Sequence, residues 1–348
     1  MGQANAKRNA KPRGKAAAAI DSVGIVGAGA WGTALAVLAT CAGRATTLYA
    51  RRPEAAQAIA EDHMNAEHLP GVPLQDEVAV TSDLAAALQA DVVLYAQPAQ
   101  HLRAFCTAAA SHWNDGAPLL ICAKGIELRT GRLLTEIAAE LLPRVGVAVL
   151  SGPSFAAPAA LGLPTAVVIA STSETLNQAL MQALSHGAFR PYGALDPIGV
   201  EVAGAAKNVL AIACGIVMGR ELGENARAGL VTRGLAEVAR LALALGGKAE
   251  TMLGLAGVGD LVLTCNSMTS RNTSLGFELG RGAKLADILA KRRSIAEGVP
   301  TAAAIEALAA RLKVEMPICT AVAALLDGRA EIDQAIRDLL ARPLKHEG

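Results

Sequence analysis

The sequence predicts an α/β fold: a Rossmann-type doubly wound parallel sheet followed by an all-helical C-terminal domain. In the first half of the chain, short apolar runs alternate with Ala-rich stretches long enough for crossover helices, the pattern of a parallel sheet covered on both faces. The second half has long helical periods and no strand-like run. A chain of 348 residues accommodates about two domains. We expect a basic tail over 1–20, a Rossmann domain over 21–195 and a helical domain over 196–348.

Each strand is expected where a run is continuously apolar, because strands covered on both faces have no polar side. Six runs meet this condition, 22–26, 45–50, 78–81, 92–96, 119–123 and 145–150, and two more, 165–170 and 189–192, extend the sheet. Crossover helices are expected over 33–40, 53–60 and 133–142. In the second half, helices are expected over 200–217, 232–245, 302–312 and 321–326.

The charge of the chain argues against nucleic acid as its main partner, since 32 basic side chains face 31 acidic ones. The first 20 residues hold five basic and no acidic side chains, which leaves 27 basic and 31 acidic side chains, about −4, in the rest. This tail could be a transit peptide, but it lacks the Ser-rich composition and the amphipathic face of one. We favour a disordered polar tail.

Residues 22–43 carry no charge and could be mistaken for a membrane span. Gly27, Gly29 and Gly32 suit a tight turn better than a lipid-facing helix, so we expect a soluble, cytoplasmic protein with no membrane span. The six cysteines are scattered without a Cys-x-x-Cys pair, which favours buried, reduced thiols. The histidines match no ligand spacing, and no metal site is expected.

The segment Gly27-Ala28-Gly29-Ala30-Trp31-Gly32 fits the motif G-x-G-x-x-G. It follows the first expected strand and opens the first expected helix, which is the context in which this motif binds a dinucleotide. The first glycine allows the tight turn, the second lets the pyrophosphate approach the backbone, and the third lets the helix pack on the strand. Amides at the helix N-terminus then bind the phosphates.

The residues after the second expected strand indicate which dinucleotide binds. An Asp or Glu there would bind the ribose 2′-hydroxyl of NAD, but this chain has Arg51 and Arg52. Two guanidinium groups without a carboxylate suit a 2′-phosphate, so NADP is favoured and NAD is possible. The alternative is that one arginine stacks on the adenine or faces solvent.

Other candidate residues follow later strands or interrupt an apolar helix. Lys124 and the segment 151–155 come after the fifth and sixth expected strands, at the carboxyl edge where ligands of such sheets bind. Either could be only a turn. Lys207 is the one charge between Glu201 and Arg220. Because a buried ammonium is costly, we expect Lys207 to point into a cleft rather than to reach solvent along its stem.

Together these residues resemble the bacterial NAD(P)-dependent glycerol-3-phosphate dehydrogenases. The matching blocks run in family order from about 23 to 317, essentially the whole chain beyond the tail. They are Gly27 to Ala36, Lys124-Gly125, Ser151-Gly152-Pro153-Ser154-Phe155, Lys207-Asn208-Val209, Asn225-Ala226-Arg227, Thr232-Arg233-Gly234, Gly257-Val258-Gly259-Asp260-Leu261, Ser270-Arg271-Asn272 and Glu297-Gly298.

The resemblance implies reversible reduction of dihydroxyacetone phosphate to sn-glycerol 3-phosphate, the backbone of membrane phospholipids. It implies that Lys207 is the general acid/base, which protonates the developing alkoxide as hydride arrives from the nicotinamide. This role requires a lowered pKa, and burial beside Lys124 would act in that direction. Lys124 would contact cofactor and substrate and stabilise the oxyanion, and Asp260 would orient the lysine or a substrate hydroxyl.

The resemblance also implies the remaining contacts. Gly152 and Ser154 would contact the glycerol portion of the substrate. Ser270, Arg271 and Asn272 would close over its phosphate, which an arginine fork binds through two hydrogen bonds. The positions that line the dinucleotide in this family, besides the glycines, are here Ala30, Trp31, Arg51, Ala156, Ile295 and Glu297, with Arg271 shared between cofactor and substrate.

Pro98-Ala99 stands where many members have Pro-Ser, which removes a hydroxyl near the nicotinamide side. Two alternatives stay open: a β-hydroxy-acid-type dehydrogenase with a carboxylate pocket, and a dinucleotide-binding sensor that has lost catalysis. The segment 270–272 disfavours the first, and the set Lys124, Lys207 and Asp260 disfavours the second. The partner is expected to be a small molecule, and the apolar helical half could bury a homodimer surface.

Overall fold

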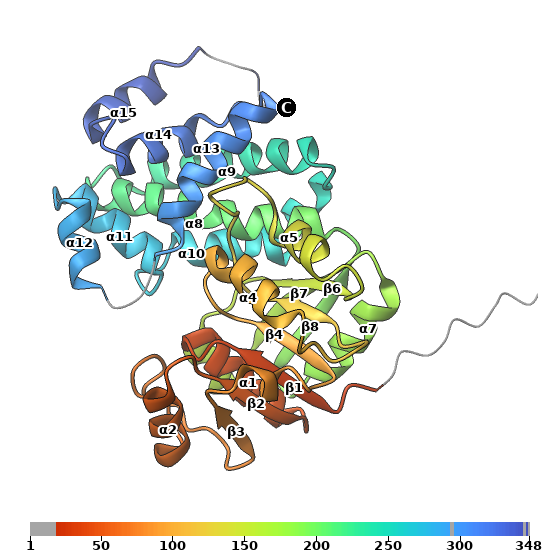
Figure 1. Ribbon diagram of the computed structural model, residues 1–348. Helices are drawn as coiled ribbons and strands as arrows, with labels where there is room; N and C mark the ends of the chain where they lie inside the picture. The colour runs from red at the N-terminus through yellow and green to blue at the C-terminus, as the bar shows by residue number, and fades with distance from the viewer. Residues whose placement is uncertain (1–18, 293–295, 344–345, 347–348) are drawn as a thin grey trace, which may run out of the picture.

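The structure is a computed structural model that describes residues 19–292, 296–343 and 346. Eight strands form one sheet: β1 (Ser22–Val26), β2 (Ala45–Tyr49), β3 (Val78–Thr81), β4 (Val92–Tyr95), β5 (Leu119–Ile121), β6 (Val147–Ser151), β7 (Thr165–Ala170) and β8 (Phe189–Ala194). Their order is β3-β2-β1-β4-β5-β6-β7-β8 (Figure 1). Neighbouring strands are parallel except β6 and β7, which are antiparallel.

The sheet confirms the predicted Rossmann-type architecture. All six expected strands are present, their ends differ from the expected ones by at most two residues, and the two further runs form β7 and β8. The antiparallel direction of β7 was not predicted, because an apolar run does not encode the direction of its strand. Of the expected tail, residues 1–18 lie outside the described residues.

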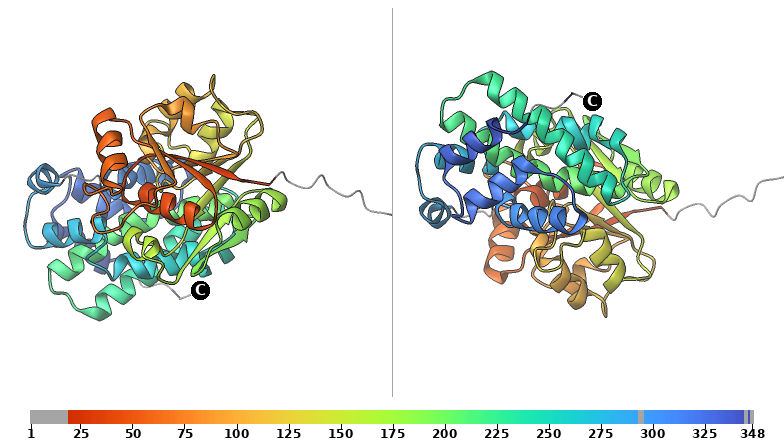
Figure 2. Two further views of the ribbon diagram at one scale, coloured as in Figure 1. Left: turned by 90° about the horizontal axis from the view of Figure 1, so that it is seen from below. Right: turned by 90° about the horizontal axis from the view of Figure 1, so that it is seen from above.

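Helices cover both faces of the sheet, as Figure 2 shows. Alternate residues of a strand face opposite sides, and on β4 they enter two different cores: Val92 and Leu94 join one, and Val93 and Tyr95 join the other. The first core includes residues of α1 (Ala30–Cys41), α2 (Pro53–Asp62) and α7 (Glu174–Leu184), and the short α6 (Ala156–Ala160) packs on α1. The second core includes residues of α3 (Leu84–Ala87), η1 (Ala99–His101), α4 (Leu102–Ala109) and α5 (Leu134–Leu141).

The second half of the chain is helical and is built around α8 (Pro197–Gly219). This helix contacts α9 (Glu224–Ala244), α10 (Asp260–Cys265), α11 (Arg271–Gly280), α13 (Gly298–Leu312) and α14 (Pro317–Leu326); η2 (Ala249–Leu253), η3 (Leu255–Gly259), α12 (Leu285–Lys291) and α15 (Ile332–Leu340) complete this half. By length and mean hydropathy (1.7) α8 would pass for a membrane span, but 94% of its apolar window is buried. Its apolar side chains therefore pack on other helices.

Glycines allow α8 and α11 to approach closely. A Cβ added to Gly215 of α8 would lie 2.1 Å from the carbonyl oxygen of Thr273, and one on Gly276 of α11 would lie 2.0 Å from that of Ile212. Both distances are far below van der Waals contact, so the spacing of the two helices depends on the missing side chains. This contact holds α11 against α8, the helix that carries Lys207 and Asn208.

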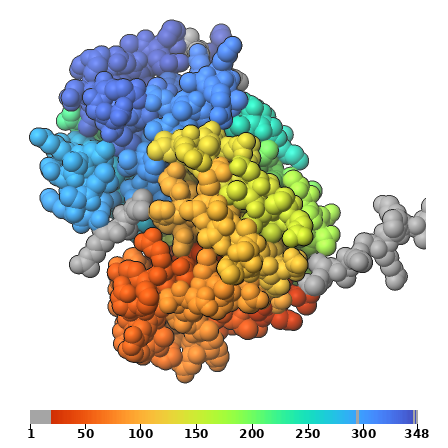
Figure 3. Space-filling view, in the orientation of Figure 1, coloured from red at the N-terminus to blue at the C-terminus, as the bar shows by residue number. Residues whose placement is uncertain are grey.

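The helical half meets the sheet at the carboxyl ends of the strands, where ligands bind in folds of this kind. Arg311 of α13 donates hydrogen bonds to the carbonyl oxygens of Thr130 (3.0 Å) and Gly131 (3.2 Å), in the segment after β5. Figure 3 shows this segment, in yellow, against the blue C-terminal helices. The two halves therefore share a polar boundary.

Candidate functional site

The glycine-rich turn has the backbone conformation and the open space that its motif predicts. Gly27 has a φ of +121°, which favours glycine, and a Cβ on Gly32 would lie 1.8 Å from the carbonyl oxygen of Gly27. Among the described residues, a Cβ on Gly29 would meet no atom within 4 Å. Gly29 precedes Ala30 and Trp31 at the start of α1, so this open space lies at a helix N-terminus, whose free backbone amides favour an anion.

Asn65, in the connection between α2 and β3, holds this turn in place. Its side-chain nitrogen donates to the carbonyl oxygen of Ala28 and to the hydroxyl of Thr33, both at 2.8 Å. Asn65 is 2% exposed. The sequence analysis did not identify this residue, because no spacing rule links a loop asparagine to a turn more than 30 positions earlier.

Arg51 and Arg52 lie just beyond the end of β2, and both are exposed. The strand end adjoins the glycine turn, since the amide of Gly27 donates to the carbonyl oxygen of Tyr49 (3.1 Å). Arg52 pairs with Glu67, with Nη2 2.5 Å from Oε2. Within the described part of the chain, the guanidinium of Arg51 has no hydrogen bond or ion pair. No carboxylate stands at positions 51 and 52, but folding brings that of Glu67 next to Arg52.

Two lysines share one buried carboxylate at the boundary of the two halves. Lys124 follows β5 and places Nζ 2.7 Å from Oδ2 of Asp260, and Lys207 of α8 places Nζ 2.5 Å from Oδ1 of the same residue. The Asp260 side chain is 1% exposed. Lys124 also donates to the carbonyl oxygen of Gly152, at 3.3 Å. The structure therefore brings together all three predicted catalytic residues.

Thr264 belongs to this cluster, although the sequence analysis did not single it out. Its hydroxyl accepts a hydrogen bond from Lys207 Nζ at 3.0 Å and lies 3.3 Å from Oδ1 of Asp260. Asp260 and Thr264 are four residues apart on α10 and therefore share a helix face. That spacing was a usable signal once Asp260 had been chosen.

The charges of this cluster shift the pKa values of its members. Burial lowers the pKa of Lys207 to about 8; the carboxylate of Asp260 opposes this change, and the nearby ammonium of Lys124 adds to it. Burial of Asp260 acts to raise its pKa, but the two ammonium groups outweigh it and hold the pKa below its ordinary value. Lys207 can therefore exchange a proton near neutral pH while Asp260 stays ionised.

Asn208 and Asn272 tie α8, α11 and α13 together beside the lysines. Asn272 donates through Nδ2 to Oδ1 of Asn208 (2.9 Å), and its own Oδ1 accepts from the amide of Gly298 (3.0 Å). Glu297, directly before α13, accepts from the amide of Ala99 at 3.1 Å. Burial raises the pKa of Glu297, whereas main-chain hydrogen bonds and the charges of Arg271 and Lys124 oppose that change.

The three residues expected to close over a phosphate differ in their availability. The Ser270 hydroxyl accepts from the amide of Thr273 (3.2 Å) and caps α11. Asn272 uses its side chain between helices, as described above. Arg271 is exposed at the first position of α11. Its positive charge acts to lower the pKa of Glu297. Arg271 is therefore the exposed member of this trio, whereas Ser270 and Asn272 are buried.

The other predicted contacts lie around the same edge of the sheet. Gly152 has a φ of +136°, and its carbonyl oxygen accepts from Ser154 at 3.1 Å as well as from Lys124. Ala156 begins α6 and packs near Ala30 and Trp31 of α1. The predicted cofactor residue Ile295 lies outside the described residues.

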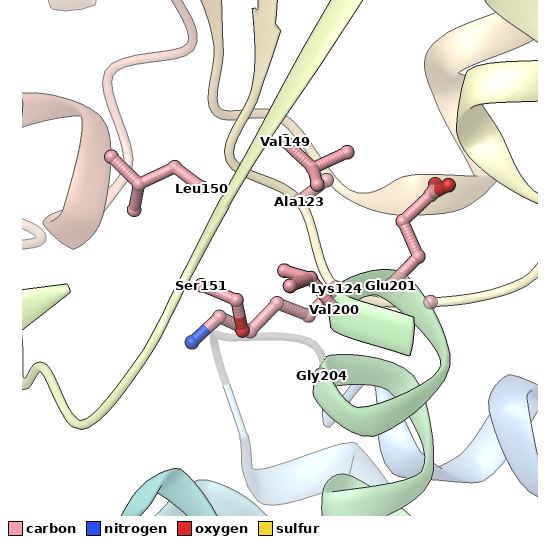
Figure 4. Close-up of a pocket in the computed structure, with 9 residues that line it drawn as sticks. Ala123, Lys124, Val149, Leu150, Ser151, Val200, Glu201 and Gly204 are labelled. Atoms are coloured by element: carbon pink, nitrogen blue, oxygen red, sulfur yellow. The ribbon is translucent and has the colours of Figure 1, made fainter. Parts of the chain in front are cut away.

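A small pocket lies beside Lys124, between the ends of β5 and β6 and the start of α8 (Figure 4). Ser151 lines it with a buried hydroxyl that has no hydrogen-bond partner among the described residues. Glu201 lines another part and accepts from the amide (3.1 Å) and the hydroxyl (2.5 Å) of Thr135. Burial raises the pKa of Glu201 to about 7, against these hydrogen bonds.

Comparison with protein families decides the relationship of the chain. Residues 22–177 match the N-terminal model and residues 196–337 the C-terminal model of NAD-dependent glycerol-3-phosphate dehydrogenase. The chain belongs to the NAD-dependent glycerol-3-phosphate dehydrogenase family. It is therefore an oxidoreductase, and the resemblance read from its motifs is confirmed.

Relatives of this dehydrogenase cover nearly its whole length. It is 53% identical over 327 residues to the NAD(P)+ glycerol-3-phosphate dehydrogenase of Caulobacter vibrioides. The aligned residues cover 94% of this chain and 99% of the relative. It is also 53% identical to that of Rhodospirillum rubrum over 330 residues, 94% and 95% of the two chains. The crystal structure of glycerol-3-phosphate dehydrogenase from Coxiella burnetii has a TM-score of 0.89 at 37% identity and covers 93% of this chain and 99% of that one.

Proposed function

We propose that the chain catalyses the reversible reduction of dihydroxyacetone phosphate to sn-glycerol 3-phosphate and so supplies the backbone of glycerophospholipids. The observation that carries the proposal is the pair of lysines, Lys124 and Lys207, on the buried carboxylate of Asp260. A binding module would need neither a lysine with a pKa near 8 nor an ionised partner for it.

The residues at the edge of the sheet fit a nicotinamide dinucleotide. Gly27, Gly29 and Gly32 with the start of α1 would hold its pyrophosphate, and Arg51 would bind its adenosine end. Glu297 and Lys124 would lie at its nicotinamide end. When bound, this cofactor supplies a hydride and its two electrons to the carbonyl carbon of the substrate.

Lys207 would supply the proton that the reduction needs. As the carbonyl carbon gains the hydride, its oxygen takes a proton from the Lys207 ammonium and becomes a secondary alcohol, and the lysine is left as a neutral amine. In the oxidation the amine removes that proton. A pKa of about 8 leaves both forms accessible near neutral pH.

Lys124 would stabilise the negative charge that develops on the substrate oxygen, because its ammonium stays at the site throughout the reaction. Asp260 would hold both ammonium groups in position through its two oxygens, and Thr264 would fix Lys207 from the other side. These three residues prearrange the charges, so little reorganisation is needed as the reaction proceeds.

Arg271 and the start of α11 would bind the phosphate of the substrate. The guanidinium is exposed and offers a fork of donors, and the helix N-terminus favours negative charge. Ser270 and Asn272 would support this site, since their side chains cap α11 and join the helices, and the Ser270 hydroxyl keeps its own hydrogen to donate. Gly152 and Ser154 would adjoin the glycerol portion.

The finer assignments also belong to this proposal. We favour NADP over NAD because two arginines follow β2. Cytoplasmic location is supported by five buried free thiols, which suit a reducing compartment. The sixth, Cys41, is exposed, contrary to the expectation that the cysteines are buried.

The test is the oxidation of NADPH, and then of NADH, with dihydroxyacetone phosphate as the only added substrate. We expect rapid loss of reduced-nicotinamide absorbance with the phosphate and none with plain dihydroxyacetone, because Arg271 has no phosphate to bind there. Protein that binds NADPH but oxidises neither NADPH nor NADH in the presence of dihydroxyacetone phosphate would contradict the proposal.

A further inference from the structure

We propose that Glu67 determines how strongly the chain discriminates between NADP and NAD, by neutralising Arg52 and leaving Arg51 as the cation that binds the 2′-phosphate. This inference deepens the proposed function and rests on its dinucleotide site. It assigns a specificity role to a carboxylate that lies outside the strand, turn and helix of the glycine motif.

The fold places Glu67 at this site through a well-anchored connection. Two residues before it, Asn65 is hydrogen-bonded to the glycine turn. Two residues after it, Leu69 is buried against α1 with Val72, and the amide of Leu69 donates to the carbonyl oxygen of Asn65 (2.8 Å). Because both flanks are fixed to the dinucleotide-binding elements, the position of Glu67 relative to β2 is fixed as well.

The backbone of Arg52 is constrained by the helix that follows it. It precedes Pro53, the first residue of α2, and occupies the cap position of that helix, so its backbone has little freedom. Its guanidinium meets Glu67 at 2.5 Å, with 51% and 44% of the two side chains exposed. His68 lies on the other oxygen of Glu67, with Nε2 3.8 Å from Oε1. The pair is thus formed at a surface that a ligand can reach.

The consequence is a site of mixed charge. Arg51 brings an unshared positive charge, whereas the Arg52–Glu67 pair brings none in sum. A 2′-phosphate is attracted by Arg51 and Arg52 but repelled by Glu67, and it must compete with this carboxylate for Arg52. The 2′-hydroxyl of NAD carries no charge and can donate a hydrogen bond to a carboxylate. Glu67 therefore weakens NADP binding relative to NAD binding.

The first experiment measures the dissociation constants of NADPH and NADH by fluorescence for the wild type and Glu67→Gln. We expect the preference for NADPH to increase about three- to tenfold, since one like charge near the phosphate is removed. The matched control is Glu306→Gln, which breaks the exposed Arg329–Glu306 pair of 2.6 Å in the helical half and should leave the preference unchanged. A Glu67→Gln preference within twofold of wild type would overturn the proposal.

A double-mutant cycle tests the neutralisation itself. Arg52→Gln should weaken NADPH binding clearly in the wild type, because it leaves the Glu67 carboxylate unneutralised near the 2′-phosphate. Adding Glu67→Gln to Arg52→Gln should recover most of that loss. Arg51→Gln should cost more than Arg52→Gln in the wild type. No recovery of NADPH affinity when Glu67→Gln is added to Arg52→Gln would contradict the mechanism. Because binding is measured without substrate, these outcomes do not depend on whether dihydroxyacetone phosphate is turned over.

Discussion

Lys207 has two protonation states that its surroundings bring close in free energy. Burial and Lys124 favour the neutral amine, and Asp260 favours the ammonium, which gives a pKa of about 8. Reduction requires the ammonium, so kcat/KM for dihydroxyacetone phosphate should fall as the pH rises through about 8. Oxidation requires the amine, so its rate should rise over the same range. The rates of reduction and oxidation should therefore change in opposite directions with pH, because both depend on the protonation of Lys207.

Thr264→Val should shift the pH at which the rate of reduction declines. The hydroxyl accepts a hydrogen bond from the ammonium of Lys207, so its removal disfavours the charged form and lowers the pKa. We expect the decline in the reduction rate to begin at lower pH, with kcat reduced about tenfold. Thr107→Val, at an exposed position of α4, serves as the control. If the decline occurs at the same pH in Thr264→Val as in the wild type, Thr264 does not contact the titrating group.

At the scale of single residues, sequence reasoning identified the side chains whose chemistry is unusual for their surroundings. A lone lysine in an apolar helix and a lysine after a strand are visible as such, and both lie in the cluster. Asn65 and Glu67 were not identified, because their partners are distant in sequence. The side-chain hydrogen bonds that Ser270 and Asn272 make within the protein could not be predicted from a motif.

Glu201 couples helix α8 to helix α5. Its buried carboxyl has a pKa of about 7 against an ordinary 4.5, so the folded chain binds this proton more tightly than the unfolded chain does. The stability that this group contributes is full below pH 4.5 and is lost as the pH rises through 7. The loss approaches about 3 kcal/mol.

Glu201→Gln should therefore flatten the fall in unfolding free energy between pH 5 and 8. The amide oxygen of glutamine can still accept a hydrogen bond from Thr135, and it does not ionise. Chemical denaturation at several pH values measures the difference, with Glu61→Gln at an exposed position of α2 as the control. An unchanged pH slope in Glu201→Gln would show that another group is responsible.

Gly276→Ala tests the contact between α8 and α11. The added Cβ would lie 2.0 Å from the carbonyl oxygen of Ile212, so we expect a loss of about 1–3 kcal/mol in the free energy of unfolding. Gly229→Ala on α9 is the matched control, since its Cβ would meet no described atom within 4 Å. That variant should be neutral or more stable by about 0.5–1 kcal/mol. Equal effects of the two substitutions would contradict the close approach.

At the scale of elements, the strands and the longest helices were predicted, but α4, α7, α11 and α15, each of 8 to 11 residues, were not. The strands were located within one or two residues, and α8 extends the expected 200–217 at both ends. The helices α10 and α12 were missed because six or seven residues are too few for a helical period to be recognised. Since Asp260 lies on α10, part of the site depends on an element that the pattern did not show.

At the scale of the whole molecule, the site exists only because the two halves meet. Lys124 comes from the sheet and Lys207 and Asp260 from the helices. The division of the chain near residue 195 stays a prediction; β8 ends at Ala194 and α8 begins at Pro197. The homodimer also stays a prediction. Sequence reasoning placed the glycine turn and Lys124 at one edge of the sheet because parallel strands end there together.

The most direct test of the account is Lys207→Ala, with turnover and NADPH binding measured on the same preparation. We predict that reduction of dihydroxyacetone phosphate falls by about 10²–10⁴-fold, the usual effect of losing a general acid, while the dissociation constant of NADPH changes less than about threefold, because the glycine turn is untouched. Unchanged turnover would contradict the role of Lys207 as proton donor, and parallel loss of NADPH binding would show that its role is structural.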